Sequence, residues 1–304
     1  MLDNGRMLLK RPKGKIDDIY IVIPVHNRKK LTKQCLRCLY DQTYKEFKIV
    51  IFDDGSTDGT FEMIKEKYPE IILLRGDGNY WWSKSVNEGI KYALKRNAQY
   101  ILLLNDDVVL PGDYVESFVN VARHKPDIIM GSPNYDLNTG KLTFAGEHKD
   151  WILATAKRNI DLFNRRTLER KVLVGSDYLP GRGLWIPAKV FKKIGLFDGK
   201  RFPQAAADYD LTIRAKRARF SVCCNMLAKV YFNLDDTGPN KFKRFGRLKN
   251  LWEYLASIKS VGNLQIRWRF GIKNCPRDLL VSYLILDTLR IIGGYVKRCF
   301  KSLF

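Results

Sequence analysis

An apolar run that ends in carboxylates constrains the fold of this chain more than any other stretch. Residues 101–104 are aliphatic, and Asn105, Asp106 and Asp107 follow them directly. A strand buried on both faces carries such a run, and it delivers the residues that follow to one edge of a sheet. Hard cations such as Mg²⁺ take oxygen ligands, often only one or two of them from protein carboxylates. An Asx turn explains the same residues equally well, so other parts of the chain must decide.

Apolar runs alternate with helical patterns in the residues that lead up to this stretch. The predicted strands lie at 19–25, which is a continuous apolar run, and at 47–52, 71–74 and 101–104. The predicted helices have apolar residues three or four positions apart, at 29–41, 60–68 and 83–96. This alternation predicts an α/β fold, in which a doubly wound, mostly parallel sheet binds ligands at the carboxyl ends of its strands.

The second half of the chain is less regular. Helices are predicted from Pro111 to His124, at 187–194 and at 208–220, with a strand at 128–130. Residues 133–180 are expected to form strands and loops that line a substrate site. The chain should therefore divide into a basic N-terminal segment over 1–16, an α/β domain over 17–239 and a basic, aromatic, helical C-terminal region over 240–304.

The charge of the chain is strongly positive and unevenly distributed. The 304 residues carry a net charge of +22, and residues 240–304 hold 14 Lys+Arg against 3 Asp+Glu, which gives +11. Such a balance indicates an anionic partner: nucleic acid, an acidic membrane surface or a phosphorylated ligand. The six cysteines show neither a disulfide framework nor zinc-ligand spacing, so reduced, packed cysteines in a reducing cytoplasm are expected.

Acidic clusters recur where predicted strands end or a predicted helix begins. The three clusters are Asp53-Asp54, Asp106-Asp107 and Asp208-x-Asp210. If the strands are parallel, the first two share one edge of the sheet. There, one carboxylate can accept hydrogen bonds from a base or a ribose while the next holds a metal that bridges two phosphates. Each cluster taken singly is also a good turn, so the interpretation depends on their combination.

Six motifs, in order along the chain, resemble those of the family 2 glycosyltransferases with the GT-A fold. They occupy residues 23–28, 53–58, 104–107, 179–183, 190–198 and 207–214, and the resemblance covers about residues 17–236. It implies an inverting enzyme that moves a sugar from a UDP-, dTDP- or GDP-linked donor to a hydroxyl of a glycan or lipid-linked acceptor. It also implies assistance by Mg²⁺ or Mn²⁺.

The resemblance assigns most of the site residues to the donor. The residues expected at the nucleotide sugar are Pro24, Val25, Asn27, Arg28, Asp53, Asp54, Lys84, Asn87, Asn105 and Asp106. Asp107 is the expected metal ligand, because residues 105–107 correspond to the Asp-x-Asp motif of the fold, with Asn at its first position. Asp235 is expected to supply a further ligand.

Asp208 matches the general base of the family, which takes a proton from the attacking acceptor hydroxyl. Ala207 stands where an acidic residue often precedes that base, so Asp210 is kept as the alternative. The residues expected to contact the sugar or the acceptor are Trp81, Trp82, Gly181, Arg182 and Asp210. For the two tryptophans, a buried aromatic pair is the competing interpretation.

The C-terminal residues 278–304 predict a basic amphipathic helix. Its apolar positions, expected to face inward, are Leu280, Leu284, Leu286, Leu289, Ile292 and Val296. Such a helix can lie on an anionic leaflet at the inner face of a membrane, or it can pack on the α/β domain. No run of about 18 uninterrupted apolar residues is present, so the chain is not expected to cross a membrane.

Two other functions compete with sugar transfer. A nucleotidyltransferase also uses a doubly wound sheet, but it would carry a Gly-rich, basic signature after the first strand, where this chain has Pro24-Val25-His26-Asn27. A nucleic-acid-binding module would explain the positive charge. However, no nucleic-acid motif is present, and no nucleic-acid partner is expected.

Overall fold

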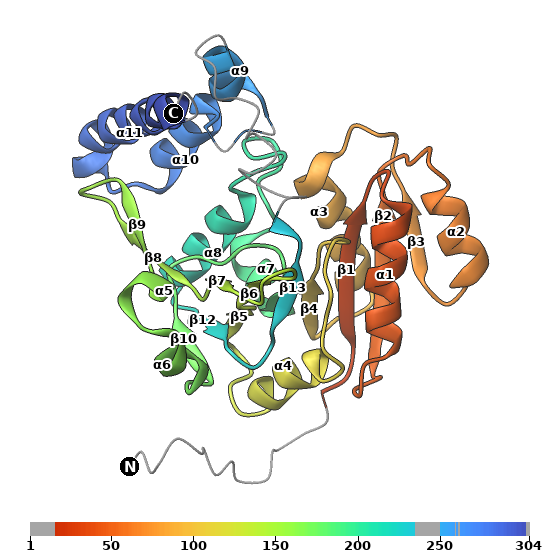
Figure 1. Ribbon diagram of the computed structural model, residues 1–304. Helices are drawn as coiled ribbons and strands as arrows, with labels where there is room; N and C mark the ends of the chain where they lie inside the picture. The colour runs from red at the N-terminus through yellow and green to blue at the C-terminus, as the bar shows by residue number, and fades with distance from the viewer. Residues whose placement is uncertain (1–15, 235–249, 259, 261, 302–304) are drawn as a thin grey trace, which may run out of the picture.

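An eight-stranded mixed sheet forms the centre of the molecule (Figure 1). The computed structural model describes residues 16–234, 250–258, 260 and 262–301. The strands of the sheet are β1 (Ile19–Val25), β2 (Phe47–Asp53), β3 (Ile72–Arg75), β4 (Tyr100–Leu103), β5 (Ile129–Gly131), β10 (Leu173–Gly175), β11 (Leu184–Pro187) and β12 (Val222–Asn225). Their order is β10-β12-β5-β11-β4-β1-β2-β3.

The first four strands are parallel, and β1 lies between β4 and β2. Strands β2 and β3 therefore extend the sheet to one side of β1, whereas β4 adds to the other side. The place where the strand order reverses is a topological switch point, and the loops that follow β1 and β4 diverge there. On the far side of β4, strand β11 runs antiparallel and joins this half to β5 and β12.

Helices cover both faces of the sheet, because successive strand residues point to opposite faces. The helices described before residue 220 are α1 (Lys29–Tyr40), α2 (Thr60–Lys67), α3 (Trp81–Leu94), α4 (Tyr114–Ala122), α5 (Asn159–Leu162), α6 (Arg165–Glu169), α7 (Ala188–Ile194) and α8 (Ala207–Arg217). On one face, Val22 and Leu103 pack with α3, α7 and α8. On the other face, Ile21 and Leu102 pack with α1, α2 and α4. The predicted doubly wound α/β fold is confirmed.

Two small sheets are built from the stretch that was predicted as strands and loops. Strands β6 (Asn134–Asp136) and β7 (Leu142–Phe144) pair with β13 (Val230–Phe232), and β8 (Glu147–Asp150) forms a hairpin with β9 (Thr155–Arg158). Tyr231 of β13 also forms an antiparallel bridge with Val109, two residues beyond the carboxylates that follow β4. The small sheet with β13 therefore lies beside the carboxyl end of β4.

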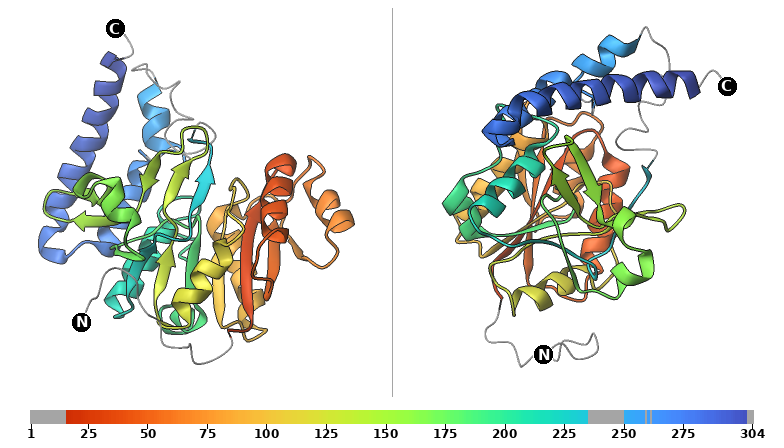
Figure 2. Two further views of the ribbon diagram at one scale, coloured as in Figure 1. Left: turned by 60° about the horizontal axis from the view of Figure 1, so that its bottom comes forward. Right: turned by 90° about the vertical axis from the view of Figure 1, so that its left-hand side faces the viewer.

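The C-terminal region is helical, as predicted. Its described residues form α9 (Leu251–Ala256), α10 (Leu264–Asn274), a short 3₁₀ turn (Arg277–Leu279) and α11 (Leu280–Lys301). Figures 1 and 2 show these helices gathered at one end of the molecule, next to α8 and the β8–β9 hairpin. The predicted domain boundary near residue 240 falls in 235–249, outside the described residues.

The inward face of α11 differs from the prediction. Its buried residues are Tyr283, Asp287, Tyr295 and Cys299, spaced by four or eight, whereas Leu286 and Leu289 are exposed. Buried Asp287 is paired with Arg267 of α10, with Asp287 Oδ2 accepting from Nε at 2.7 Å. A charge that finds its partner inside the fold can turn inward, and it then leaves aliphatic residues on the outside.

One stretch of the described residues, Arg277–Lys297, is long and apolar enough to cross a membrane by length and composition alone. This differs from the sequence expectation, which required an uninterrupted apolar run. Only 17% of the apolar window is buried. Arg290, a charge within this stretch, donates to the main-chain carbonyls of Leu153 and Ala154 at the tip of the β8–β9 hairpin, so it is bound to the domain.

Candidate active site

Two strand ends meet through an arginine at the switch point. Arg28 follows β1, and its Nη1 donates to Asp106 Oδ1 and to Asp107 Oδ2, each at 3.1 Å. Both carboxylates follow β4, which pairs with β1 in parallel. Arg182, in the segment before β11, lies with Nη2 3.6 Å from Asp107 Oδ2. Arg28, Asp106 and Asp107, which were each expected at the donor or its metal, thus lie together, and Arg182 joins them.

The carboxylates keep one free oxygen each. In the described part of the chain, Asp106 Oδ2 and Asp107 Oδ1 are buried without a hydrogen-bond partner, and so is Arg182 Nε. Burial raises the pKa of Asp106 to about 7, although Arg28 opposes the shift. Buried oxygens without partners are costly unless something else binds them. Their oxygen chemistry fits a hard divalent cation.

A complete protein cage for a metal is not formed by the described residues, which contain no group of three or more His, Cys, Asp or Glu side chains suited to one. The expected ligand Asp235 lies outside the described residues. Within them, Asp107 and Asp106 fit a cation that receives its other ligands from phosphates and water, as Mg²⁺ often does.

The carboxylates after β2 have two different surroundings. Asp54 accepts hydrogen bonds from the main-chain amides of Gly78 at 2.9 Å and of Tyr80 and Trp81 at 3.0 Å, so it holds the loop before α3. Asp53 Oδ1 accepts from the Ser56 amide at 2.6 Å, whereas its Oδ2 is buried without a partner. Burial raises the pKa of Asp53. Of the two, Asp53 retains an oxygen for a ligand.

The loop after β1 is tied to the loop after β2. Asn27 has a φ of +52°. Its side-chain Oδ1 accepts a hydrogen bond from the main-chain amide of Thr57 at 2.7 Å, and its main-chain amide donates to Ser56 Oγ at 2.9 Å. His26 Nδ1 donates to the Asp54 carbonyl at 2.6 Å. Pro24 and Val25 form the end of β1 itself. No role was predicted for His26, and only its position in the loop after β1 could have indicated one.

The two tryptophans have different environments. Trp82 is half-buried, and its indole Nε1 donates to Asn105 Oδ1 at 3.2 Å. A Cβ at Gly181 would lie 2.4 Å from Trp82 Cζ2, so only glycine allows this approach. Trp81, at φ +56°, is 39% exposed at the first position of α3. Trp82 therefore packs between Asn105 and Gly181, whereas Trp81 is exposed at the surface.

Two predicted donor residues on α3 have partners within the protein. Both polar atoms of the Asn87 side chain bond to the main chain of Phe197, with Nδ2 donating to the carbonyl at 2.9 Å and Oδ1 accepting from the amide at 3.1 Å. Exposed Lys84 lies with Nζ 3.7 Å from the centre of the Tyr80 ring. Asn87 thus connects α3 with the loop before α8, and Lys84 remains at the surface.

Asp208 lies in the first turn of α8. Its Oδ2 accepts from the Gly181 amide at 2.8 Å, and its Oδ1 accepts from the Tyr209 amide at 2.9 Å. Burial raises the pKa of Asp208, and these amides together with Arg182 oppose the shift. A raised pKa brings a carboxylate closer to the range in which it can accept a proton near neutrality. Residues 181 and 182 thus connect Asp208 with Asp107.

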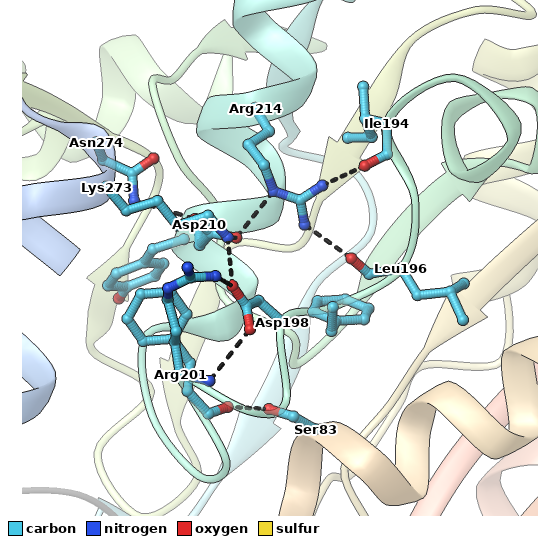
Figure 3. A network of polar contacts seen from close by, with 12 residues as sticks. Ser83, Ile194, Leu196, Asp198, Arg201, Asp210, Arg214, Lys273 and Asn274 are labelled. Carbon is cyan, nitrogen blue, oxygen red and sulfur yellow. Dashed lines mark hydrogen bonds and ion pairs between the residues drawn. The ribbon is translucent and has the colours of Figure 1, made fainter. Parts of the chain in front are cut away.

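Asp210, the alternative base, belongs to a different network (Figure 3). It is fully buried, and it accepts hydrogen bonds from Arg214 Nε at 2.9 Å, Lys273 Nζ at 2.9 Å and Asn274 Nδ2 at 3.0 Å. Both of its oxygens are used by these partners. Neither Lys273 nor Asn274 was predicted, because residues more than 60 positions away carry no local signal.

A model of one protein family matches residues 20–181, which is more than half of the chain. Its description is Glycosyl transferase family 2. The chain belongs to this family. The resemblance inferred from the six motifs is therefore confirmed, and this family 2 protein is a glycosyltransferase.

Curated relatives share the family over part of their length. Glycosyltransferase GlyG of Streptococcus pneumoniae serotype 4 is 24% identical over 209 residues, which cover 66% of this chain and 67% of GlyG. The poly(ribitol-phosphate) beta-glucosyltransferase of Bacillus spizizenii is 25% identical, over 56% of this chain and 31% of the relative. With other relatives the match is also partial: it spans 17% of GlyA of Streptococcus pneumoniae.

Solved structures show the same fold at low sequence identity. The mannosyltransferase PcManGT from Pyrobaculum calidifontis, in complex with GDP-Man and Mn²⁺, has a TM-score of 0.55 at 13% identity, over 95% of this chain and 75% of that one. S. aureus TarS has a TM-score of 0.57 at 14% identity, over 91% and 55%. The predicted GT-A fold of this family 2 glycosyltransferase is confirmed.

Proposed function

We propose that this glycosyltransferase transfers a sugar, with inversion, from a nucleoside-diphosphate donor to a hydroxyl of a glycan or lipid-linked acceptor. One observation carries the proposal: the adjacent residues 181 and 182 lie against the proposed base and the proposed metal ligand, respectively. The Gly181 amide holds Asp208, and Arg182 lies beside Asp107. Single displacement at an anomeric carbon needs a base for the attacking hydroxyl and a centre that stabilises the leaving diphosphate, and these two adjacent residues link the two proposed centres.

Asp208 acts as the general base in this proposal. It accepts the proton of the acceptor hydroxyl while that oxygen attacks the anomeric carbon, and the bond to the diphosphate breaks on the opposite side. Its raised pKa and its two amide contacts suit a carboxylate that must be both oriented and basic. A positioned base contributes about 10²- to 10⁴-fold to the rate of such a step.

Arginines and acidic residues bind the donor in this proposal. Arg28 and Arg182 both lie beside the Oδ2 atom of Asp107 and supply positive charge for a diphosphate. Asp107, with Asp106, would hold Mg²⁺ or Mn²⁺, which would supply Lewis-acid stabilisation of the departing diphosphate. The Mn²⁺ and GDP-Man bound to PcManGT support this assignment. Asp53 has a free buried oxygen for the base or ribose, and exposed Trp81 offers a stacking surface for a sugar.

The outer face of α11 suits an anionic membrane surface, so we place the enzyme at the cytoplasmic face of a membrane. Val281, Ile285 and Leu289 are spaced by four residues and are 71%, 55% and 62% exposed. Arg277 and Lys297 are exposed near the two ends of this face. An apolar face flanked by basic residues favours insertion at the headgroup level of an anionic leaflet. This position would bring a lipid-linked acceptor to the site.

A thermal-shift screen tests the donor class. Ligand that binds only the folded protein raises stability by about 2.7 kcal/mol at 100 times its Kd. We expect one of the UDP-, dTDP- and GDP-linked sugars to raise Tm with Mn²⁺ present, and to do so less without it. Tm values that stay unchanged with all three classes, with and without Mn²⁺ or Mg²⁺, would contradict the proposal.

A further inference from the structure

Helix α10 of the C-terminal region reaches the helix that carries the proposed base (Figure 3). Two consecutive residues at its end make the contact. Lys273 Nζ donates to Asp210 Oδ2 at 2.9 Å, and Asn274 Nδ2 donates to Asp210 Oδ1 at 3.0 Å. Asp210 is completely buried. A buried carboxylate needs such partners, because desolvation of an unpaired charge is costly.

Lys273 also bridges Asp210 to a second carboxylate. Its Nζ lies 2.7 Å from Asp198 Oδ2, in the turn that precedes α8. Asp198 is further bound by Arg201, with Nη1 donating at 2.9 Å, and these cations lower the pKa of Asp198. Lys273 is therefore the cation shared by two neighbouring carboxylates. Without it, Asp198 and Asp210 would repel each other across the start of α8.

The start of α8 depends on contacts from outside the helix. Ala206, which precedes its first residue, has φ +68° and no side chain that could cap the exposed amides. Asp208 lies in this first turn, and the amide of Asp210 donates to the Ala206 carbonyl at 2.9 Å. First turns are the part of a helix that frays most easily. The amides of Gly181 and Tyr209 bind the Asp208 carboxylate itself, and the side-chain contacts of Asp210 anchor the same helical turn two residues further on.

Arg214 secures the same carboxylate from within α8. It donates to Asp210 and to the main-chain carbonyls of Ile194 at 2.6 Å and Leu196 at 2.8 Å, so it attaches α8 to the end of α7 and the residues that follow. Arg214 and Lys273 share the Oδ2 atom of Asp210, whereas Asn274 binds the Oδ1 atom. Asp210 has all of these hydrogen-bond partners only when α10 is in place.

We propose that Lys273 and Asn274 are positioning residues for Asp208, and that the helical region after residue 250 is part of the catalytic architecture. This inference rests on the proposed function, in which Asp208 is the base. Lys273 and Asn274 do not touch the substrate. They fix Asp210, two positions along the helix, and thereby the direction of the Asp208 carboxylate.

The experiment compares Lys273→Met with Lys273→Arg and Arg201→Met in the full chain. Arg201 is the matched control, because it binds Asp198 but does not contact Asp210, and its side chain is 58% exposed. For Lys273→Met we expect kcat to fall at least about tenfold, since misplacement by 1 Å can cost about 10². The donor KM should stay within about twofold, because the donor contacts are untouched.

Rescue and the pH profile separate positioning from general damage to the fold. Lys273→Arg should restore most of kcat, and Arg201→Met should stay within about twofold of the original enzyme. In Lys273→Met, the acid limb of the profile of kcat against pH should move, because that limb reports the base in the complex. If Lys273→Met does not fold, Asn274→Ala takes its place, with an expected loss in kcat of at least about threefold and an unchanged donor KM.

Two results would overturn the inference. One is an unchanged kcat in Lys273→Met, or in Asn274→Ala if that variant replaces it. The other is an equal loss of kcat in Lys273→Met and Arg201→Met. Both leave the proposed function intact as long as the original enzyme transfers sugar and Asp208→Asn does not. An original enzyme without transfer activity would instead contradict the proposed function.

Discussion

The main-chain amide of Gly181 donates a 2.8 Å hydrogen bond to Asp208 Oδ2. This contact joins the segment before β11 to the first turn of α8. Because the next residue, Arg182, lies 3.6 Å from Asp107 Oδ2, a single short segment connects the proposed base with the proposed metal site. Small changes in this segment should therefore affect both centres.

Gly181→Ala tests the closeness of this packing. The new methyl group would lie 2.4 Å from Trp82 Cζ2 and 2.6 Å from Cη2, so either the ring or the segment must move. We expect a loss of about 1–3 kcal/mol in the free energy of unfolding. We also expect a lower kcat, measured as release of nucleoside diphosphate. Gly175→Ala is the control, because its Cβ would meet nothing within 4 Å. Equal behaviour of the two variants would refute the packing argument.

In Asp107→Asn, most of the metal-dependent rise in Tm that the donor causes should be lost. The amide keeps the shape of the side chain but supplies a neutral oxygen, which is a weaker ligand for a hard cation. The measurement is the difference in Tm with and without Mn²⁺ at saturating donor. Asp18→Asn is a control at a surface carboxylate paired with Lys48, and its metal-dependent shift should be unchanged. A full Mn²⁺ effect in Asp107→Asn would rule out this residue as the ligand.

Lys149 should make stability depend on pH in the alkaline range. Burial beside the rings of Trp151 and Tyr283 lowers its pKa from 10.5 to about 8, although Asp287 raises it and Arg267 and Arg290 lower it further. Between these two values the unfolded chain binds more protons at this residue than the folded chain. The contribution of Lys149 to stability therefore rises with pH over this interval.

Lys149→Met removes that contribution. We expect the slope of the unfolding free energy against pH between about 8 and 10.5 to be less positive in the variant than in the original protein. Urea denaturation at a series of pH values measures both slopes. An identical slope in the two proteins would show that Lys149 keeps its ordinary pKa in the folded state.

The membrane proposal is tested by flotation with vesicles that contain phosphatidylglycerol. Val281→Asp combined with Leu289→Asp places two charges on the exposed face of α11, and we expect flotation to be lost. Leu227→Asp is the control, because Leu227 is 49% exposed outside the C-terminal region. Salt should also weaken flotation of the original protein, since basic residues contribute to attraction. Undiminished flotation of the double variant would exclude this face as the contact.

The parallel half of the fold could be predicted from sequence because its signals are local. The run 19–25 is buried on both faces, and β1 has those same bounds. Helix α3 begins at Trp81, two residues earlier than predicted, because Asp54 receives the amides of residues 80 and 81. Such contacts between loops have no periodicity in the sequence, so a helix start that depends on them cannot be predicted from the sequence.

For the candidate site, the sequence predicted which residues take part better than it predicted how they are arranged. Asp106 and Asp107 were expected together because they follow one strand, and Arg28 was expected at the donor because of the family resemblance. The separation of Asp208 from Asp210 could not be foreseen. It depends on Lys273 and Asn274 of α10, and a contact across more than 60 residues leaves no trace in local spacing.

Asp208→Asn provides the most direct test of the central claim. Transfer is measured as metal-dependent release of nucleoside diphosphate in the presence of acceptor, and donor affinity is measured by titration calorimetry. The account predicts that kcat falls by at least about 10², while the donor Kd stays within about twofold, because the base acts only on the acceptor proton. A variant that transfers sugar at the original rate would contradict it.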